Sequence, residues 1–154
     1  MIKSNRYFKW IRLETPIVKI FQEYIEDKRW YKTYLSKRGN KQASVDFLGR
    51  FYDSDTGITL KDVAVEVRSL NVAKSDIESA KWYIEFPIEK LNELMKFWRM
   101  WKEVYVVYLL GDKVYFIDWN YYLSHNFELW KIDWEYYIKL PVRNFIFCGI
   151  YQNQ

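Results

Sequence analysis

Three charged side chains lie inside apolar segments that have the character of neighbouring strands. Asp46 stands in SVDFLG, and Glu66 and Arg68 stand in VAVEVRS. A charged group is costly to bury unless it is paired or bound to a metal. Because strand side chains alternate between two faces, the valines of VAVEV point one way, while Glu66 and Arg68 point the other. If the two strands pair, Asp46 can lie beside Glu66.

The patch formed by these residues has two interpretations. Two carboxylates offer hard oxygen ligands, which suit Mg²⁺ or Mn²⁺. Alternatively, Arg68 neutralises Asp46 or Glu66 in a cross-strand ion pair, since sheets use opposite charges in this way. We favour the metal site. Glu85 is a further catalytic candidate, because the segment before the second predicted helix can run beside the patch, although its position also fits plain solvent exposure.

The elements that position this patch follow from apolar periodicity and from turn residues. Thr15 and Pro16 are a good N-cap and first helical residue, which predicts a helix from 16 to about 28. Pro87 opens a second helix in the same way, and its expected buried stripe is Ile88, Leu91, Leu94, Met95 and Trp98. We expect strands at 30–35, on both sides of a plain turn at 53–57, and at 81–86, 104–110, 113–119 and 144–150, with a short helix near 127–134.

The order of these elements, with Asp46 on one central strand and Glu66-Val67-Arg68 on the next, resembles the PD-(D/E)XK nuclease superfamily. The family pattern is an Asp, a variable hairpin and then Asp/Glu-x-Lys on an apolar strand, and here 19 residues separate the two acids. The resemblance covers roughly residues 15–119. The small, Tyr/Trp-rich and Gly-poor chain also resembles the small nucleases of archaeal filamentous viruses.

The resemblance implies an α/β (α+β) fold, in which helices flank a central mixed β-sheet with a restriction-endonuclease-like αβββαβ core. It also implies that Asp46 and Glu66 bind Mg²⁺ or Mn²⁺ and that the backbone carbonyl of Val67 is an extra ligand. Members of the family often add a glutamate from the first helix. Glu23 is the nearest fit in this chain, although its helical phase supports it poorly.

The sequence departs from the family at Arg68, which stands where the family has lysine. Arginine stays charged and cannot act as a base, but it can clamp phosphate oxygens in a bidentate way. In an active site, Arg68 would therefore stabilise the transition state electrostatically. Otherwise a nearby lysine replaces it, or the site is inactive.

The distribution of charge favours nucleic acid as a partner. Residues 1–42 hold 11 Lys/Arg and 4 Asp/Glu, whereas the whole chain has a net charge of only +4. A basic segment of this kind suits an anionic partner, although modest positive charge is common in soluble proteins. Residues 1–14 are expected to form an edge strand or an arm that either grips phosphates or docks on the core. The candidate DNA-binding residues are Arg6, Lys9, Lys37, Arg38 and Lys41.

Size and composition set further bounds. A chain of 154 residues that is 50% hydrophobic fits one nuclease-like domain, 1–154, with its core at about 15–119 and an aromatic C-terminal extension at 120–154. Cys148 is the single cysteine, so we expect a structural thiol, no internal disulfide and no zinc site. The start resembles no signal peptide, and no apolar run is long enough to span a bilayer. We expect a cytoplasmic protein, in the host cytoplasm if it is viral, with no membrane partner; a homodimer is left open.

Three functions compete on these observations. The leading hypothesis is a metal-dependent DNA nuclease, expected to be an endonuclease. The second is a non-catalytic nucleic-acid-binding protein that keeps the nuclease fold, which the basic first quarter and Arg68 favour. The third is an interaction protein whose aromatic residues build an interface.

Overall fold

The computed structural model describes residues 2–38, 45–70, 83–119 and 128–152, with side chains from Glu14 onward. Its elements are α1 (Ile2–Arg29), β1 (Lys32–Lys37), β2 (Phe47–Tyr52), β3 (Thr59–Leu70), β4 (Tyr83–Pro87), α3 (Ile88–Arg99), β5 (Glu103–Leu110), β6 (Lys113–Asp118), β7 (Leu129–Ile132), β8 (Glu135–Pro141), the 3-10 helix η1 (Val142–Asn144) and β9 (Ile146–Ile150). Among the described residues, no helix is long and apolar enough to cross a membrane.

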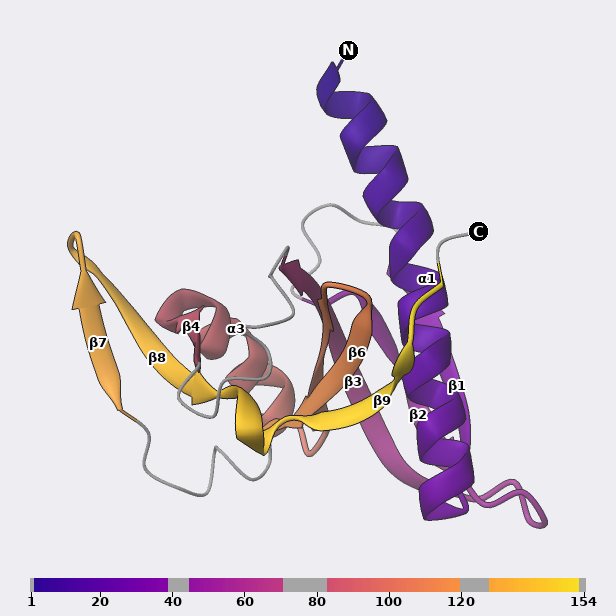
Figure 1. Ribbon diagram of the computed structural model, residues 1–154. Coiled ribbons are helices and arrows are strands. Elements are labelled where there is room, and N and C mark those ends of the chain that lie inside the picture. The colour runs from indigo at the N-terminus through magenta and orange to yellow at the C-terminus, as the bar shows by residue number, and fades with distance from the viewer. Residues whose placement is uncertain (1, 39–44, 71–82, 120–127, 153–154) are drawn as a thin grey trace.

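A six-stranded mixed sheet forms the centre of the molecule, in the order β1-β2-β3-β5-β6-β9. Strands β3 and β5 run parallel, and the other neighbours in this sheet are antiparallel. A second, three-stranded sheet has the order β4-β8-β7. Figure 1 shows the β7–β8 hairpin at one end of the molecule and α1 at the other. The predicted α+β fold, with a mixed sheet flanked by helices, is confirmed.

Helix α1 covers one face of the six-stranded sheet with apolar residues at helical spacing. Ile17, Phe21 and Ile25 recur every four residues and are fully buried. The Phe21 ring lies 5.4 Å from the ring of Tyr105 and 5.3 Å from that of Phe116, measured between centroids. The valines of β3 at 63, 65 and 67 point to this same layer, as the alternation of the strand predicts.

Helix α3 and the second sheet cover the opposite face. Leu91 and Leu94 of α3 pack with Ile84 and Phe86 of β4 and with Trp119 in a second core. Pro87 is the N-cap of α3, as predicted. Trp98, however, is exposed rather than part of the buried stripe, because the last turn of α3 extends beyond the layer that buries Leu91 and Leu94.

Two predictions about the N-terminal segment are wrong. The expected helix at 16–28 begins at Ile2, and Pro16 lies inside it. The expected edge strand or arm at 1–14 is therefore the first half of the same helix, except for residue 1, which lies outside the described residues. Figure 1 shows this half of α1 extending beyond the sheet. Packing of the second half against the sheet outweighs the lost proline hydrogen bond.

The C-terminal part also differs from expectation. In the segment expected as a helix near 127–134, residues 129–134 form β7 and the turn into β8, and residue 127 lies outside the described residues. Trp130 of β7 pairs with Tyr137 of β8. Cross-strand pairing of this kind favours aromatic residues. The last strand is confirmed as β9, and burial raises the pKa of its Cys148 thiol, as expected for a structural cysteine.

We predict that Gly49→Ala destabilises the protein by about 3 kcal/mol or more. A Cβ at residue 49 would lie 1.8 Å from the Tyr34 carbonyl oxygen of the paired strand β1, so the sheet next to the patch would have to move. Gly57→Ala is the matched control. Gly57 has φ 74° and open space around it, so its substitution should cost only about 1 kcal/mol. Urea unfolding of both variants measures the difference, and equal losses would contradict the prediction.

Candidate active site

Asp46 lies in a bend immediately before β2 rather than inside a strand. Its backbone is still held by the sheet, because its N–H donates to the Val65 carbonyl at 3.1 Å and its carbonyl accepts from the Arg38 N–H at 2.8 Å. Its Oδ2 accepts a hydrogen bond of 2.8 Å from the backbone N–H of Val67. The Asp46 carboxylate therefore caps β3 at the point where β2 no longer pairs with it.

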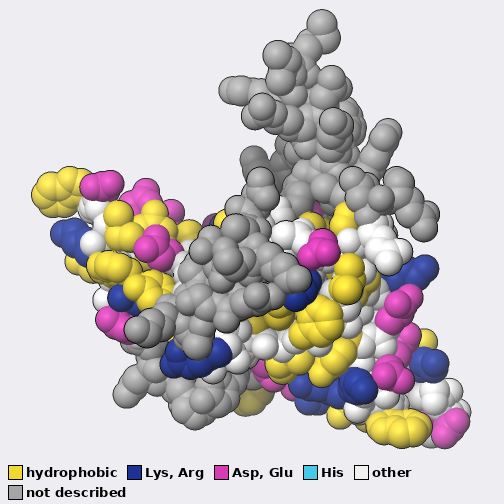
Figure 2. Space-filling view, viewed as in Figure 1, with side chains coloured by type: hydrophobic (Ala, Val, Ile, Leu, Met, Phe, Trp, Pro, Cys, Tyr) yellow, Lys and Arg dark blue, Asp and Glu magenta, His cyan; other side chains and the backbone are white. Residues whose placement is uncertain are grey.

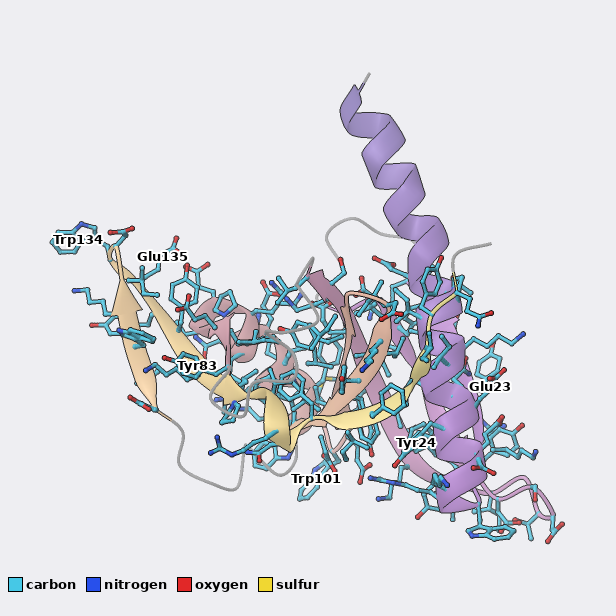
Figure 3. All side chains as sticks on the ribbon, in the orientation of Figure 1. Glu23, Tyr24, Tyr83, Trp101, Trp134 and Glu135 are labelled. Atoms are coloured by element: carbon cyan, nitrogen blue, oxygen red, sulfur yellow. The ribbon has the colours of Figure 1, made fainter. Side chains whose placement is uncertain are left out.

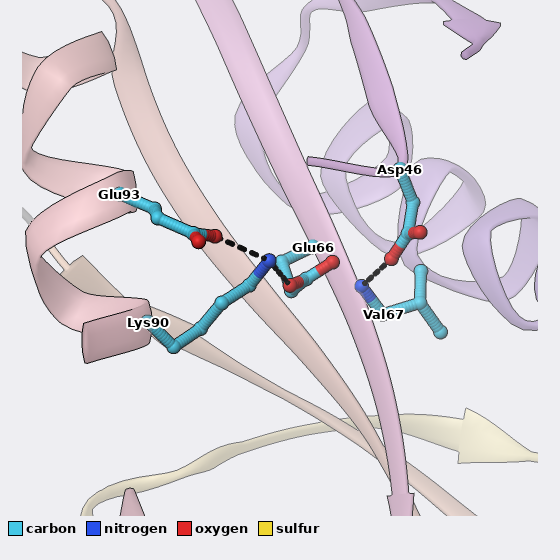
Figure 4. Close-up of polar contacts among 5 residues, drawn as sticks. All are labelled: Asp46, Glu66, Val67, Lys90 and Glu93. Atoms are coloured by element: carbon cyan, nitrogen blue, oxygen red, sulfur yellow. Dashed lines mark hydrogen bonds and ion pairs between the residues drawn. The ribbon is translucent and has the colours of Figure 1, made fainter. Parts of the chain in front are cut away.

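Glu66 lies in the middle of β3 and is only 6% exposed to solvent. Its side chain points to the α3 face, as the alternation of VAVEV predicts. There its Oε2 lies 2.5 Å from the Nζ of Lys90, which the first turns of α3 provide. Glu93 of the same helix holds Lys90 from the other side, at 3.2 Å. Figure 4 shows this chain of contacts beside Asp46 and Val67.

Burial and the neighbouring Asp46 carboxyl together raise the pKa of Glu66 to about 9. Lys90 opposes this shift, but less strongly. Burial lowers the pKa of Lys90, yet its hydrogen bonds to Glu66 and Glu93 and the charges of these acids outweigh burial, so the Lys90 pKa stands above its usual value. The Glu66 carboxyl therefore keeps its proton at neutral pH unless a cation replaces it.

The Val67 carbonyl faces the same edge of β3 as Asp46. The N–H and the C=O of one strand residue point toward the same neighbouring strand, and the Val67 N–H points at Asp46. Pairing of β2 with β3 ends at Val65, while β5 pairs with β3 on its other side as far as Leu70. The structure thus brings together Asp46, Glu66 and the Val67 backbone.

Arg68 lies on the same face of β3 as Glu66, but its guanidinium is directed to aromatic rings. Its Cζ stands 5.2 Å from the centroid of the Phe86 ring. Burial raises the pKa of Tyr108, and the neighbouring Arg68 opposes that shift. The ion-pair interpretation expected Arg68 to neutralise an acid of the patch, but the basic partner that the structure gives Glu66 is Lys90.

The structure does not bring Glu85 to Asp46 and Glu66. Glu85 lies on β4 of the second sheet, opposite Lys139 of β8. It is exposed, whereas its neighbours Ile84 and Phe86 point into the core. Glu23 is also elsewhere, because it lines a hollow between α1 and β9. Neither carboxylate shares the environment of Glu66.

Glu14 is the acidic residue of α1 that sequence reasoning missed. It is 5% exposed, and its Oε2 lies 3.2 Å from the Nζ of Lys37 at the end of β1. Lys37 pairs with Phe47, the residue after Asp46, so Glu14 lies near the same end of β2, on the α1 face of the sheet, whereas Glu66 points to the α3 face. A helix assumed to begin at Pro16 excluded Glu14, although a buried acid one turn before Ile17 and Val18 shares their helical face.

The candidate DNA-binding residues are placed only in part. Lys37 is turned toward Glu14 of α1, and Arg38 is exposed just after β1. Arg6 and Lys9 lie on α1, but their side chains are outside the described part of the chain, as is Lys41 altogether. Their contact with DNA stays a prediction.

The donors at this corner are chemically suited to a hard divalent cation, although the described residues include no group of three or more acidic, His or Cys side chains close enough to hold one. The buried Glu66 carboxyl, the Asp46 carboxylate and the Val67 carbonyl are all oxygen donors. In the structure, the ammonium group of Lys90 provides the positive charge beside Glu66.

Several chains among the solved structures match this chain. No protein family matches the chain by sequence, and no curated protein does. The Holliday junction resolvase Hjc from Archaeoglobus fulgidus, an archaeal hyperthermophile, is 14% identical, with a TM-score of 0.41 over 71% of this chain and 76% of that chain. At this identity and TM-score the similarity says nothing about activity, and the likeness to viral nucleases stays a prediction.

We predict that the metal-free protein loses stability as the pH rises from about 5 to about 9. The folded state keeps a proton on Glu66 up to a pKa of about 9, whereas the unfolded chain releases it near the usual value of 4.5. Between these values the folded state holds more protons, so the free energy of unfolding falls with pH by at most about 1.4 kcal/mol per unit.

Urea unfolding in a chelator, repeated across this pH range, measures the slope. Glu66→Gln should flatten it, because glutamine has no proton to release. A slope that is unchanged in Glu66→Gln would show that another group causes it.

Proposed function

We propose that the protein is a metal-dependent nuclease, an endonuclease that hydrolyses phosphodiester bonds of DNA, with Asp46 and Glu66 holding the metal. The observation that carries the proposal is the buried Glu66 carboxyl in the middle of β3, with the half-buried Asp46 carboxyl beside it. A protein gains no stability from two adjacent carboxyl groups when one of them has a pKa raised to about 9. Strongly perturbed acids of this kind are typical of functional sites.

Mg²⁺ or Mn²⁺ fits the oxygen donors of Asp46, Glu66 and the Val67 carbonyl. Such a cation would supply charge neutralisation at the scissile phosphate and make a bound water more acidic. The chain's own part is to fix the two carboxylates on a rigid strand pair and to keep Glu66 away from bulk water. The hydrogen bond from the Val67 N–H orients Asp46 for this role.

Lys90, rather than Arg68, would do the work of the lysine in the family motif. Its ammonium group forms an ion pair with Glu66, and its flexible stem lets it turn to a phosphate oxygen or to the attacking water once Glu66 binds a cation. Glu93 orients it meanwhile. Arg68, held over Phe86, contributes positive potential to the same face of β3 and stabilises the transition state from a greater distance.

Glu14 is a candidate for the glutamate that the first helix of these nucleases often provides. Its burial and its place near the Asp46 end of β2 support this role. Lys37 is the basic partner of Glu14 in the structure, as Lys90 is of Glu66. Both acids therefore have a lysine that can release them when a cation and a phosphate enter together.

A non-catalytic nucleic-acid-binding protein is the second candidate. The observation that favours it is the stable internal pairing of both buried acids with lysines, which needs no metal to be satisfied. Salt-dependent DNA binding without cleavage in Mg²⁺ or Mn²⁺ would decide for it.

We predict that Asp46→Asn and Glu66→Gln each abolish DNA cleavage in Mg²⁺ or Mn²⁺ while the protein stays folded. Each substitution keeps the size of the side chain but removes a charged oxygen ligand. Cleavage of plasmid DNA, with and without a chelator, is the measurement, and far-ultraviolet circular dichroism checks folding. Mn²⁺ should also raise the melting temperature of the wild type and not that of Glu66→Gln. Full cleavage by either variant would contradict the assignment.

We further predict that Lys90→Met lowers the cleavage rate about 100-fold or more, which is the usual loss when a group that serves the transition state is removed. Arg68→Met should lower it much less, because its guanidinium is held at Phe86 and Tyr108. Single-turnover rates of both variants at saturating Mg²⁺ make the comparison. If Arg68→Met is the more damaging substitution, the motif position and not α3 provides the essential cation.

A further inference from the structure

Three tryptophans occupy backbone conformations that favour glycine. Trp30, Trp101 and Trp134 have φ values of 64°, 63° and 73°. They are also 87%, 93% and 88% exposed, so their rings add almost nothing to the core. A bulky residue in the left-handed region costs stability, and an exposed ring does not return that cost. A role in binding, rather than in folding, would explain why tryptophan occupies these positions.

Trp101 is the clearest case, because it occupies the glycine position of a helix end. At the C-terminus of α3, the Lys102 N–H donates to the Phe97 carbonyl and the Trp101 N–H donates to the Trp98 carbonyl, both at 3.1 Å. This pair of bonds is the Schellman motif, in which the residue equivalent to Trp101 is usually glycine. The backbone at this point would be more stable with glycine.

The surroundings of Trp101 combine aromatic rings with positive charge. A hollow of about 450 Å³ is lined by Trp98, Arg99, Trp101, Lys102 and Glu103. Glu103, the one acid among the described residues of this lining, is already engaged, since it accepts from the Lys61 ammonium at 2.7 Å and from the Tyr105 hydroxyl at 2.6 Å. The hollow therefore presents two indole rings with Arg99 and Lys102 beside them, which is complementary to an anionic ligand with a flat ring.

Trp134 has the same backbone and exposure but opposite surroundings. It lies at the tip of the β7–β8 hairpin, where its chain neighbours are Asp133 and Glu135. A small recess beside it is also lined by Glu89. Figure 3 shows Trp101 and Trp134 pointing away from different parts of the molecule, and Figure 2 shows acidic side chains among the apolar ones over the hairpin. Lys131 lies over the Trp134 ring, with its Nζ 4.8 Å from the centroid, but the three nearby acids outnumber it, and their negative charge disfavours a phosphate backbone.

Taking the nucleic-acid substrate of the proposed function as given, we propose that the hollow at Trp98 and Trp101 binds an unpaired base of single-stranded nucleic acid. The base stacks on the Trp101 ring, and Arg99 and Lys102 contact the flanking phosphates. Base–aromatic stacking with basic residues is the general means of holding single strands. Trp98 lies about 12 Å along α3 from Lys90, at 1.5 Å per residue, and Trp101 follows just beyond the end of the helix, so one substrate with a single-stranded segment can reach both.

The test is binding of a fluorescent 20-nucleotide oligo(dT) by the full chain at low salt with a chelator, so that no cleavage occurs. Trp101→Gly should weaken binding at least about fivefold, the lower end of stacking losses. The same variant should melt at the wild-type temperature or about 2–4 °C higher, because glycine fits the left-handed backbone. Loss of affinity without loss of stability is the result that distinguishes a binding role from a structural one.

Matched variants sharpen the outcome. Trp134→Gly relieves the same kind of backbone strain and should leave oligo(dT) binding unchanged. Trp101→Phe keeps a stacking ring and should retain most of the affinity. Binding of a 20-base-pair duplex should respond much less to Trp101→Gly, because paired bases do not offer their faces.

The proposal is overturned if Trp101→Gly binds oligo(dT) within twofold of wild type. It is also overturned if light scattering shows that this variant changes the oligomeric state, since a second copy of the chain would then occupy the hollow. Its failure is distinct from that of the nuclease assignment. If the wild type cuts DNA with metal and Trp101→Gly binds oligo(dT) as well as the wild type does, the stacking site alone is rejected. If Trp101→Gly loses oligo(dT) binding but the wild type does not cut DNA, the nuclease assignment alone is rejected.

Discussion

The burial of the Glu66 carboxyl is the interaction on which the candidate site depends. β3 is held between β2 and β5, and Glu66 near its centre is only 6% exposed to solvent. The cost of desolvating this carboxyl is reduced by Lys90, which comes from α3 rather than from β3 itself. The same solution recurs at Glu14, which Lys37 of β1 neutralises. Each buried acid is thus paired with a lysine from another element of the fold. These two pairs link α1 and α3 to opposite faces of the same sheet.

This arrangement makes the site adjustable rather than merely stable. A buried ion pair adds little to stability, because desolvation of both charges offsets their attraction. Its value lies in what it permits, since a lysine on a flexible stem can leave its acid without any change in the backbone. The strands that hold Asp46 and Glu66 are the rigid part, and the ammonium groups are the movable part.

The sequence was sufficient for those features that depend on local periodicity. The positions of Asp46 and Glu66 on adjacent segments, the face shared by Glu66 and Arg68, and the helix after Pro87 all follow from alternation and turn residues. Lys90 and Glu14 could not be found in this way, because their roles depend on how each helix packs against the sheet. For Glu14 the error was specific. Pro16 was interpreted as a helix start, although a proline in the interior is tolerated when the rest of the helix is well packed.

The parallel pairing of β3 with β5 has a consequence for the order of folding. Strands β1, β2 and β3 are joined by short connections and can pair early, whereas β5 reaches β3 only after the chain from residue 71 to residue 102 has crossed over, which includes α3 and Lys90. Closing such a long loop is slow compared with forming a hairpin. Glu66 is therefore still hydrated and ionised in the early hairpin, and it becomes a buried acid only when the crossover docks. The chemistry of the site is thus created in a late step of folding.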